Sequence, residues 1–191
     1  MPKGAHSVTT AWTLAEASLE AASDPRWAAD RAVIEEALGK TNSGCAAHGI
    51  PAPNRQTRDQ QRERMLDICA QCHSDFFSRH QLEHGDRVAR ESNHVMAEAV
   101  RTVMDLYRDG TLRCPNAPRG GIPILLTGKP NGNDIENRLF AMYLGHRMHG
   151  IEGTFHCRSQ DALWWGWSEL DRDLVEIKSL ALELRAHRKR P

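Results

Sequence analysis

The sequence lacks an excess of charge of either sign, because 25 Lys and Arg residues balance 25 Asp and Glu residues among its 191 positions. A net charge of zero argues against a general binder of nucleic acid or of anionic membranes. No apolar run approaches the roughly 18 residues that a membrane span requires. The opening, MPKGAHSVTTAW, has no charged segment followed by an apolar run, so we do not expect it to be a secretory signal.

Strand signals and disulfide signals are equally scarce. The only β-like run covers 121–126, and the proline within it argues against a central strand. There is no internal repeat and no low-complexity tract. The number of cysteines is odd, which does not suit a closed disulfide framework. The five are Cys45, Cys69, Cys72, Cys114 and Cys157.

The residues that are present predict an all-α fold with long helices. Apolar positions recur at helical spacing, and Ala, Leu and Glu are abundant. At 21.5 kDa and 40% hydrophobic residues, the chain is long enough to bury a core. We expect helices over 10–22 and 25–38, from about residue 57 to the mid-70s, and over 85–109, 134–149 and 163–186.

Proline, glycine and capping residues predict where these helices begin and end. Pro25 follows a capping residue and is expected at a first helical position. We expect Gly85 to begin a helix and Gly110 to end it. The remaining expected boundaries are a stop at Gly39, a cap at Asn133 or Asp134, and breaks at Gly150 and Gly153.

We interpret residues 1–191 as a single helical region. Its parts are N-terminal helices with a loop (1–55), two helices around a cysteine motif (56–110), a Pro/Gly-rich loop (111–133) and C-terminal helices (134–191). A loop of over twenty residues is long for a compact domain and suggests function or docking. The last helix carries a heptad stripe that packs either on the chain's own core or against another subunit. The stripe consists of Leu170, Leu174, Ile177, Ala181 and Leu184.

The strongest chemical signal is Cys69-Ala70-Gln71-Cys72-His73, a C-x-x-C-H motif. In c-type cytochromes the two thiols add to the vinyl groups of a haem, and the adjacent histidine binds its iron. Two intervening residues place both thiols within reach of one porphyrin edge. The motif therefore predicts covalent haem c, with Cys69 and Cys72 as tethers and His73 as iron ligand.

Other uses of the same residues stay open. A zinc site lacks a second C-x-x-C, but Cys45 and His48 could join Cys69 and Cys72, with or without His73. A redox dithiol normally accompanies a βαβ pattern, which is absent here. The motif could also arise by chance.

A haem used only for electron transfer needs a second axial ligand. His146 and His156 flank the glycines at which the chain is expected to turn, and His6 follows Gly4 closely, so these three are the candidates. The tryptophans at 164, 165 and 167 pack in the core or contact a haem face. We interpret the remaining histidines as ordinary surface residues: His48, His80, His84, His94, His149 and His187.

An ordered series of segments resembles the C-terminal part of hydroxylamine oxidoreductase-like (HAO-like) octahaem cytochromes c. The central ones are MLDICAQCHSDFF, AEAVRTVMDLYRDG, LGHRMHGIEGTFH and WWGWSELDRDLVEI. The opening MPKGAHSVTTAW and DPRWAADRAVIEEALG are also similar to that family. The resemblance therefore extends over nearly the whole chain.

This resemblance implies a periplasmic or otherwise extracytoplasmic, largely helical and often trimeric protein. It implies redox chemistry on small nitrogen compounds such as hydroxylamine, nitrite or hydrazine. The motif at Cys69, Cys72 and His73 would match the family's last haem-attachment site. His146 and His156 would match histidines that ligate haems, and His6 the histidine that follows a C-x-x-C-H-Met-Pro sequence.

The chain also departs from this family. It has one attachment motif, whereas octahaem proteins carry one for each haem, and the upstream catalytic haem is missing. Oxidising members carry a cross-linking Tyr before the aromatic-Gly segment, where this chain has no Tyr and Asp161 lies nearby. We therefore expect a C-terminal fragment with a reductive or purely electron-transferring role.

Three functional hypotheses follow. The first is a haem c-binding electron-transfer segment whose partners are other haem-bearing segments or subunits, a redox partner protein and further copies of the chain in a homotrimer. The second is a cytosolic helical zinc-binding module that binds partner proteins. The third is a non-functional remnant that exposes apolar surface meant to face porphyrin.

Overall fold

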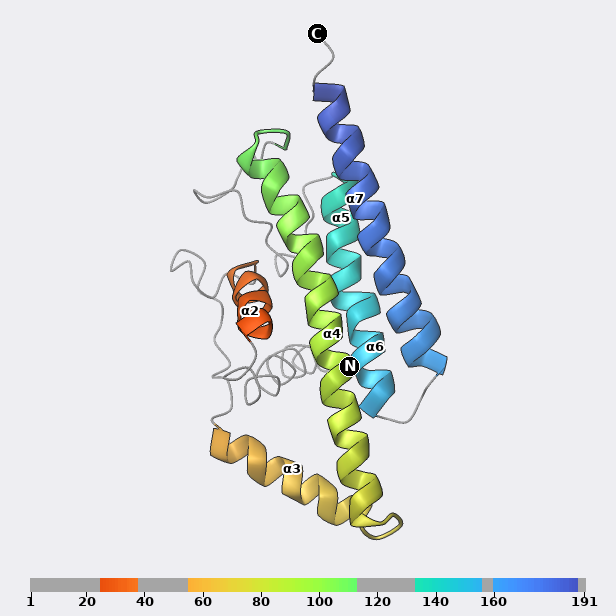
Figure 1. Ribbon diagram of the computed structural model, residues 1–191. Coiled ribbons are helices and arrows are strands. Elements are labelled where there is room, and N and C mark those ends of the chain that lie inside the picture. The colour runs from red at the N-terminus through yellow and green to blue at the C-terminus, as the bar shows by residue number, and fades with distance from the viewer. Residues whose placement is uncertain (1–24, 38–54, 113–132, 156–159, 189–191) are drawn as a thin grey trace, which may run out of the picture.

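The computed structural model describes residues 25–37, 55–112, 133–155 and 160–188, and every regular element in these ranges is a helix (Figure 1). The predicted all-α fold is confirmed. The expected helix over 10–22 and most of the loop over 111–133 lie outside the described residues. No helix in the described ranges is long and apolar enough to cross a membrane. The elements are α2 (Pro25–Ala37), α3 (Arg55–Cys69), α4 (Asp75–Arg108), α5 (Asp134–Ala141), the π-helix η1 (Met142–His146), α6 (Arg147–Phe155), the π-helix η2 (Asp161–Ser168) and α7 (Glu169–Arg188).

Helix α4 is the central element, with 34 residues and a length of about 50 Å. It begins ten residues before the expected start at Gly85. The Ser74 side chain accepts a hydrogen bond from the Phe77 amide at 3.2 Å and caps the helix there. Gly85 is buried within the helix and does not interrupt it. The other end agrees with the sequence, since Gly110 has a φ of 72° and ends the helix.

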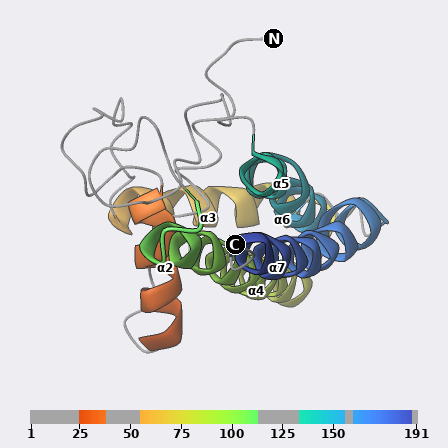
Figure 2. The same cartoon turned by 90° about the horizontal axis from the view of Figure 1, so that it is seen from above.

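Three rods form the main body of the molecule: α4, α7 and the consecutive elements α5, η1 and α6 (Figures 1 and 2). The core lies between them and includes Leu106, Leu139 and Tyr143. The heptad positions of the last helix contribute to the same core. Leu170, Leu174, Ile177 and Ala181 are buried, and Leu184 packs against them from the edge. The stripe therefore packs on the chain's own core.

The expected breaks at Gly150 and Gly153 do not occur, because α6 runs through both residues. These glycines instead allow close packing of α6 on η2. A Cβ atom on Gly166 would lie 2.3 Å from the Gly150 backbone, and one on Gly153 would lie 2.7 Å from the Ala162 nitrogen. Two backbones touch here with no room for side chains.

An arginine is buried where α6 meets α4. The Arg147 guanidinium donates through Nε and Nη2 to Asn93 Oδ1 at 3.0 and 2.7 Å and lies 5.3 Å from the Tyr143 ring centre. Burial lowers the pKa of Arg147, while Tyr143 opposes that shift. The side chain is fully buried, so its charge depends on these few partners.

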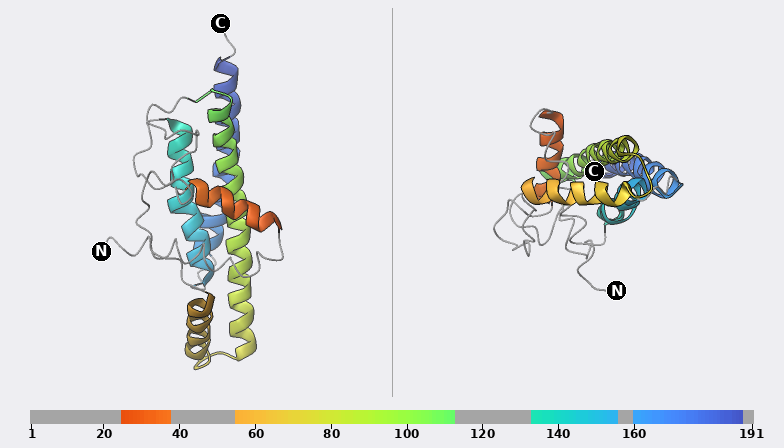
Figure 3. Two further views of the ribbon diagram at one scale, coloured as in Figure 1. Left: turned by 90° about the vertical axis from the view of Figure 1, so that its left-hand side faces the viewer. Right: turned by 90° about the horizontal axis from the view of Figure 1, so that it is seen from below.

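Helices α2 and α3 lie outside the three rods and contact α4 (Figure 3). Helix α2 begins at Pro25, as predicted, and buries Trp27 and Ile34. Helix α3 is joined to the first half of α4 by ion pairs. Arg62 bonds Asp86 at 2.8 Å, and Arg79 reaches Glu63 at 3.3 Å.

Candidate functional site

The C-x-x-C-H motif forms the corner between α3 and α4. The carbonyl of Cys69, the last residue of α3, accepts hydrogen bonds from the amides of Cys72 and His73 at 3.1 and 2.9 Å. The amide of Ala70 donates to the Leu66 carbonyl at 2.8 Å and continues the helical turn. Backbone bonds thus hold the two cysteines and the histidine together in one compact turn.

The reactive side chains of this turn are accessible. Both thiols are free; Cys69 is half-buried and Cys72 exposed. His73 is exposed, and its ring lies 4.8 Å from that of Phe77, one helical turn further along. The thiols and the imidazole can therefore react with a ligand without any rearrangement of the core.

Large apolar side chains around the turn are exposed as well. Ile68 is 67% exposed and Phe76 80%, and Met65 and Phe77 are exposed beside them. Such grouped apolar surface commonly marks a binding site. A porphyrin is a flat apolar ring, so these four side chains together with two free thiols and one histidine suit a covalently attached haem.

Of the three predicted distal ligands, the structure describes only His146, at the end of η1. Its Nδ1 lies 2.5 Å from Asp173 Oδ2, and Asp173 is fully buried and also bonded by Arg138 at 3.2 Å. A carboxylate on Nδ1 leaves Nε2 as the metal-binding nitrogen, which is the usual support of a metal-ligating histidine. A π-helix in an α-helical rod is also frequent at functional sites.

The same carboxylate contact occurs at His94 on α4, for which the sequence predicts an ordinary surface residue. His94 Nδ1 lies 2.7 Å from Asp30 Oδ2, and Arg101 bonds the other oxygen at 2.6 Å. Arg26 Nε also approaches this nitrogen, at the longer distance of 3.2 Å. Asp30 is 64 residues away in the sequence, so no local spacing could have revealed the pair.

The other candidate ligands lie outside the described residues: His6, His156, Cys45 and His48. Within the described ranges, no three His, Cys, Asp or Glu side chains are grouped so that they could hold a metal ion. The described part of the chain therefore does not assemble the alternative zinc site by itself.

The tryptophans at 164, 165 and 167 differ in how far they are buried. Trp164 and Trp165 are exposed, so the core-packing interpretation is wrong for both. Trp167 is partly buried against the hydrophobic core. Helix η2 therefore presents two aromatic rings outward while it contacts α6 through Gly166.

Comparison with known proteins finds a family match that includes this corner. Residues 47–120, which contain the motif and most of α4, match the family described as "Seven times multi-haem cytochrome CxxCH". The fold is similar to that of a chain in a reducing HAO-like protein complex from Kuenenia stuttgartiensis, with a TM-score of 0.66. The predicted resemblance to HAO-like multihaem cytochromes is confirmed. The cofactor that this family implies is covalent haem c with its iron.

The similarity to the Kuenenia chain is limited both in sequence identity and in the length that it covers. The sequence is 21% identical to the Kuenenia chain, and the match covers 78% of this chain and 38% of that one. This likeness shows a shared fold. The chain thus spans well under half the length of the solved HAO-like chain. No curated protein matches the sequence.

Proposed function

We propose that the chain binds haem c through Cys69, Cys72 and His73 and transfers electrons within an HAO-like multihaem cytochrome. The observation that supports this most strongly is the corner between α3 and α4. It combines two free thiols and an accessible imidazole with exposed apolar side chains. Bound haem iron supplies a one-electron couple whose potential depends on axial ligands, burial and hydrogen bonding.

In this proposal each residue of the corner has a distinct task. The Cys69 and Cys72 sulfurs would tether a haem, and His73 would supply a nitrogen ligand to its iron. Phe77, whose ring contacts that of His73, limits rotation of the imidazole. The exposed side chains of Ile68 and Phe76 would cover a bound porphyrin and exclude water from it. The ion pairs between α3 and α4 keep the turn in place.

We propose that His146 would supply a nitrogen ligand to a haem on another segment, because its neighbour Arg147 contacts Asn93, about 27 Å along α4 from the attachment turn. Asp173 Oδ2 lies 2.5 Å from its Nδ1, and this contact fixes the orientation of the ring and leaves Nε2 for the iron. His94 is supported by the same kind of carboxylate contact from Asp30. His6 and His156 remain candidates from the sequence resemblance alone.

The wider activity that we propose is redox conversion of a small nitrogen compound such as hydroxylamine, nitrite or hydrazine. The chain would correspond to the C-terminal helical region and carry electrons to or from a catalytic haem elsewhere. Two points favour the reductive direction: no Tyr lies near Asp161, and the Kuenenia complex is described as reducing. An extracytoplasmic location, other haem-bearing subunits, a redox partner protein and a homotrimer belong to the same proposal.

Covalent haem content tests the attachment site. The chain is exported to a periplasm that contains a c-type maturation system, and haem resistant to acid–acetone extraction is quantified. We expect one covalent haem per chain. Cys69→Ser/Cys72→Ser should lose it completely. His73→Ala leaves both thiols in place. Any haem that remains covalently attached in this variant should have a changed Soret spectrum, because its iron has lost the imidazole.

A matched control and a metal analysis complete the test. Cys45→Ser removes a cysteine outside the motif and should leave covalent haem unchanged. A wild-type chain without covalent haem but with one zinc, lost in Cys45→Ser, would overturn the proposal and support the zinc module. An exported chain with neither haem nor zinc and no cooperative unfolding would support the remnant hypothesis.

A further inference from the structure

Helix α3 packs on the rest of the molecule with little apolar surface. Among the side chains of α3 that the structure describes, Leu66 alone is buried, whereas Met65 and Ile68 are exposed. Helix α7, in contrast, buries Leu170 and Ile177 in the main core. A helix of 15 residues is only marginally stable in water by itself and depends on packing against other elements. Helix α3 therefore needs contacts of another kind.

Charged side chains provide those contacts. The Arg62 guanidinium on α3 donates to the two carboxylate oxygens of Asp86 on α4, at 3.3 and 2.8 Å. From α4, Arg79 donates to the two oxygens of Glu63 on α3, at 3.3 and 3.4 Å, and its Nε also donates to Asp75. These pairs are half-buried or exposed, so dissolved salt can screen them. We call the residues that join the two helices the ion-pair clamp: Arg62, Glu63, Arg79 and Asp86.

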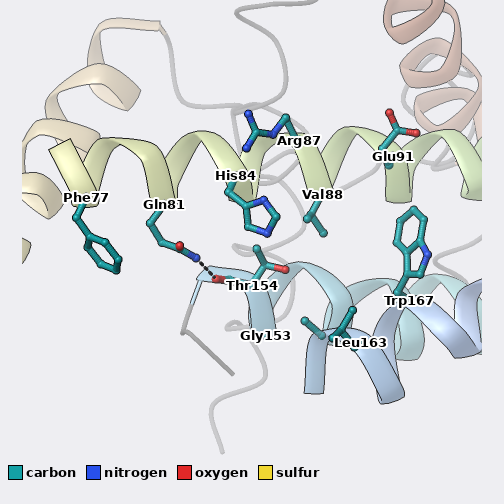
Figure 4. A pocket seen from close by; sticks show the side chains of 11 residues that line it. Phe77, Gln81, His84, Arg87, Val88, Glu91, Gly153, Thr154, Leu163 and Trp167 are labelled. Atoms are coloured by element: carbon teal, nitrogen blue, oxygen red, sulfur yellow. Dashed lines mark hydrogen bonds between the residues drawn. The ribbon is translucent and has the colours of Figure 1, made fainter. Parts of the chain in front are cut away.

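The clamp and the main body use opposite faces of α4. Arg79 and Asp86 are seven residues apart and therefore share one side of the helix. Gln81 and Val88 are also seven apart but lie two positions later, a rotation of about 200° around the helix axis. With Trp167 they line an apolar cavity of about 680 Å³ between α4 on one side and α6 with η2 on the other (Figure 4). Detachment of α3 would therefore leave the face of α4 that meets the body unchanged.

The first half of α4 has its own attachments. The Ser74 side chain caps the helix by accepting from the Phe77 amide at 3.2 Å. The Gln81 amide donates to the Thr154 carbonyl of α6 at 3.4 Å (Figure 4). Helix α3 is continuous with this structure through Cys69, its last residue, and the short turn that follows. Residues 70–74 therefore form a hinge between a secured helix and one that is held mainly by charge.

We propose that α3 is a hinged arm: it detaches from α4 in the haem-free chain when the ion-pair clamp is screened, and an attached haem holds it closed. The inference rests on the proposed function, since the haem would be tethered to Cys69 at the end of the arm and to Cys72 within the hinge. Ile68 of the arm and Phe76 of α4, both mostly exposed without haem, would then contact the same porphyrin. Detachment gives the turn freedom to receive the porphyrin, and attachment removes that freedom.

Hydrogen–deuterium exchange measured by mass spectrometry tests the arm. The full chain is produced without a haem-attachment system and labelled in about 0.1 M and about 1 M NaCl, between which the Debye length falls from about 10 to about 3 Å. We expect the α3 amides to exchange about threefold to tenfold faster at the higher salt concentration, because the clamp weakens and a detached α3 unfolds. The amides of α7 should exchange at the same rate in both solutions.

A charge exchange tests the clamp itself. Arg62→Glu places two carboxylates opposite each other and should raise α3 exchange at low salt to at least the rate that wild type reaches at high salt. Arg62→Glu/Asp86→Arg restores an ion pair of reversed polarity and should return both the rate and its salt dependence toward wild type. Glu98→Gln is the matched control, because it breaks the 2.6 Å pair of Glu98 with Lys178 between α4 and α7. It should leave α3 exchange unchanged, and circular dichroism shows whether each variant keeps its helices.

The exported chain with covalent haem should show slow, salt-independent exchange in α3. Equal α3 exchange at the two salt concentrations in the haem-free chain would overturn the arm. An equal salt effect in α3 and α7 would also overturn it, because that result reports unfolding of the whole chain. Rapid, salt-dependent α3 exchange in the haem-loaded chain would overturn closure by haem. An exported chain without covalent haem would overturn the attachment and its closure of the arm, whereas salt-dependent detachment is decided in the haem-free chain alone.

Discussion

The body formed by the three rods and the corner between α3 and α4 use apolar residues in opposite ways. In the body, Met96, Leu106 and Ile151 are almost completely removed from water. At the corner, residues of the same character are exposed, with Phe76 80% accessible. The body is a folded protein interior. The corner has apolar side chains of the kind found in an interior, but protein does not cover their exposed sides.

This difference indicates where a cofactor belongs. Exposed apolar side chains next to free thiols cannot be explained by folding of the corner alone, because burial against protein would stabilise each of them by roughly 1.5–3 kcal/mol. In the function that we propose, a porphyrin would supply the missing contacts. The body keeps its shape through side-chain and backbone contacts within the chain, so it can position the corner before any haem is attached.

The largest predicted effect tests the closest backbone contact in the body. In Gly166→Ala, the new Cβ would lie 2.3 Å from the Gly150 backbone, which cannot move like a flexible side chain. We expect a loss of about 3 kcal/mol or more in the free energy of unfolding, or separation of η2 from α6. Urea denaturation followed by circular dichroism measures it.

Gly145→Ala is the control for that substitution. Apart from its two chain neighbours and the backbone of its own helix, nothing lies within 4 Å of a Cβ at this position. An alanine inside a helix is favoured by about 0.5–1 kcal/mol over glycine. We therefore expect Gly145→Ala to be neutral or stabilising. Equal denaturation midpoints for the two variants would contradict the proposed backbone contact.

The second prediction concerns the buried arginine. Asn93→Leu removes the acceptor of two Arg147 hydrogen bonds and leaves a buried cation poorly satisfied. We expect a loss of about 2–3 kcal/mol, since bonds to charged groups contribute about 1.5–3 kcal/mol. Adding Arg147→Met should recover part of it, and a double-mutant cycle measures the coupling. Strictly additive effects of the two changes would show that the pair does not interact.

Local signals in the sequence predicted the ends of several helices. Pro25 acts through the φ angle that its own ring fixes, and Gly110 through the positive φ that a residue without a Cβ adopts freely. Asn133 caps α5 through its own side chain. The predicted start of α4 at Gly85 is wrong, because the Ser74 side chain caps the helix ten residues earlier and Gly85 continues it. Glycine was also misread at Gly150, where tertiary contact with Gly166 decides its role.

In the candidate site, too, the sequence predicts local features but not contacts between distant residues. Cys69, Cys72 and His73 are adjacent, so spacing alone predicted them. The carboxylate behind His146 is 27 residues away, and the one behind His94 is 64 residues away. Only the folded chain brings such pairs together. For the same reason, the sequence could not distinguish Trp167, which lines a cavity, from the exposed Trp164.

The third prediction compares truncations in the two regions. In the haem-free chain, Phe76→Ala should change the free energy of unfolding by no more than about 0.5 kcal/mol, because the ring is mostly in water. Leu106→Ala, in the core, should lose about 2–5 kcal/mol. With haem attached, Phe76→Ala should become clearly destabilising. An unchanged effect in the presence of haem would mean that Phe76 does not contact the cofactor.

The smallest effect is expected at the far end of the body, where Asp109 follows α4 and joins it to α7. Hydrogen bonds from Thr111 and then Arg185 lower the pKa of Asp109 to about 2. A carboxyl whose pKa is lowered by folding stabilises the protein above its unfolded pKa and loses that contribution as the pH falls toward 2. Asp109→Asn should therefore have a slightly lower urea midpoint than wild type at pH 7, and the difference should shrink between pH 4 and 2. A difference that stays constant over this range would show that the charge of Asp109 contributes nothing, and that the α4–α7 junction depends on packing alone.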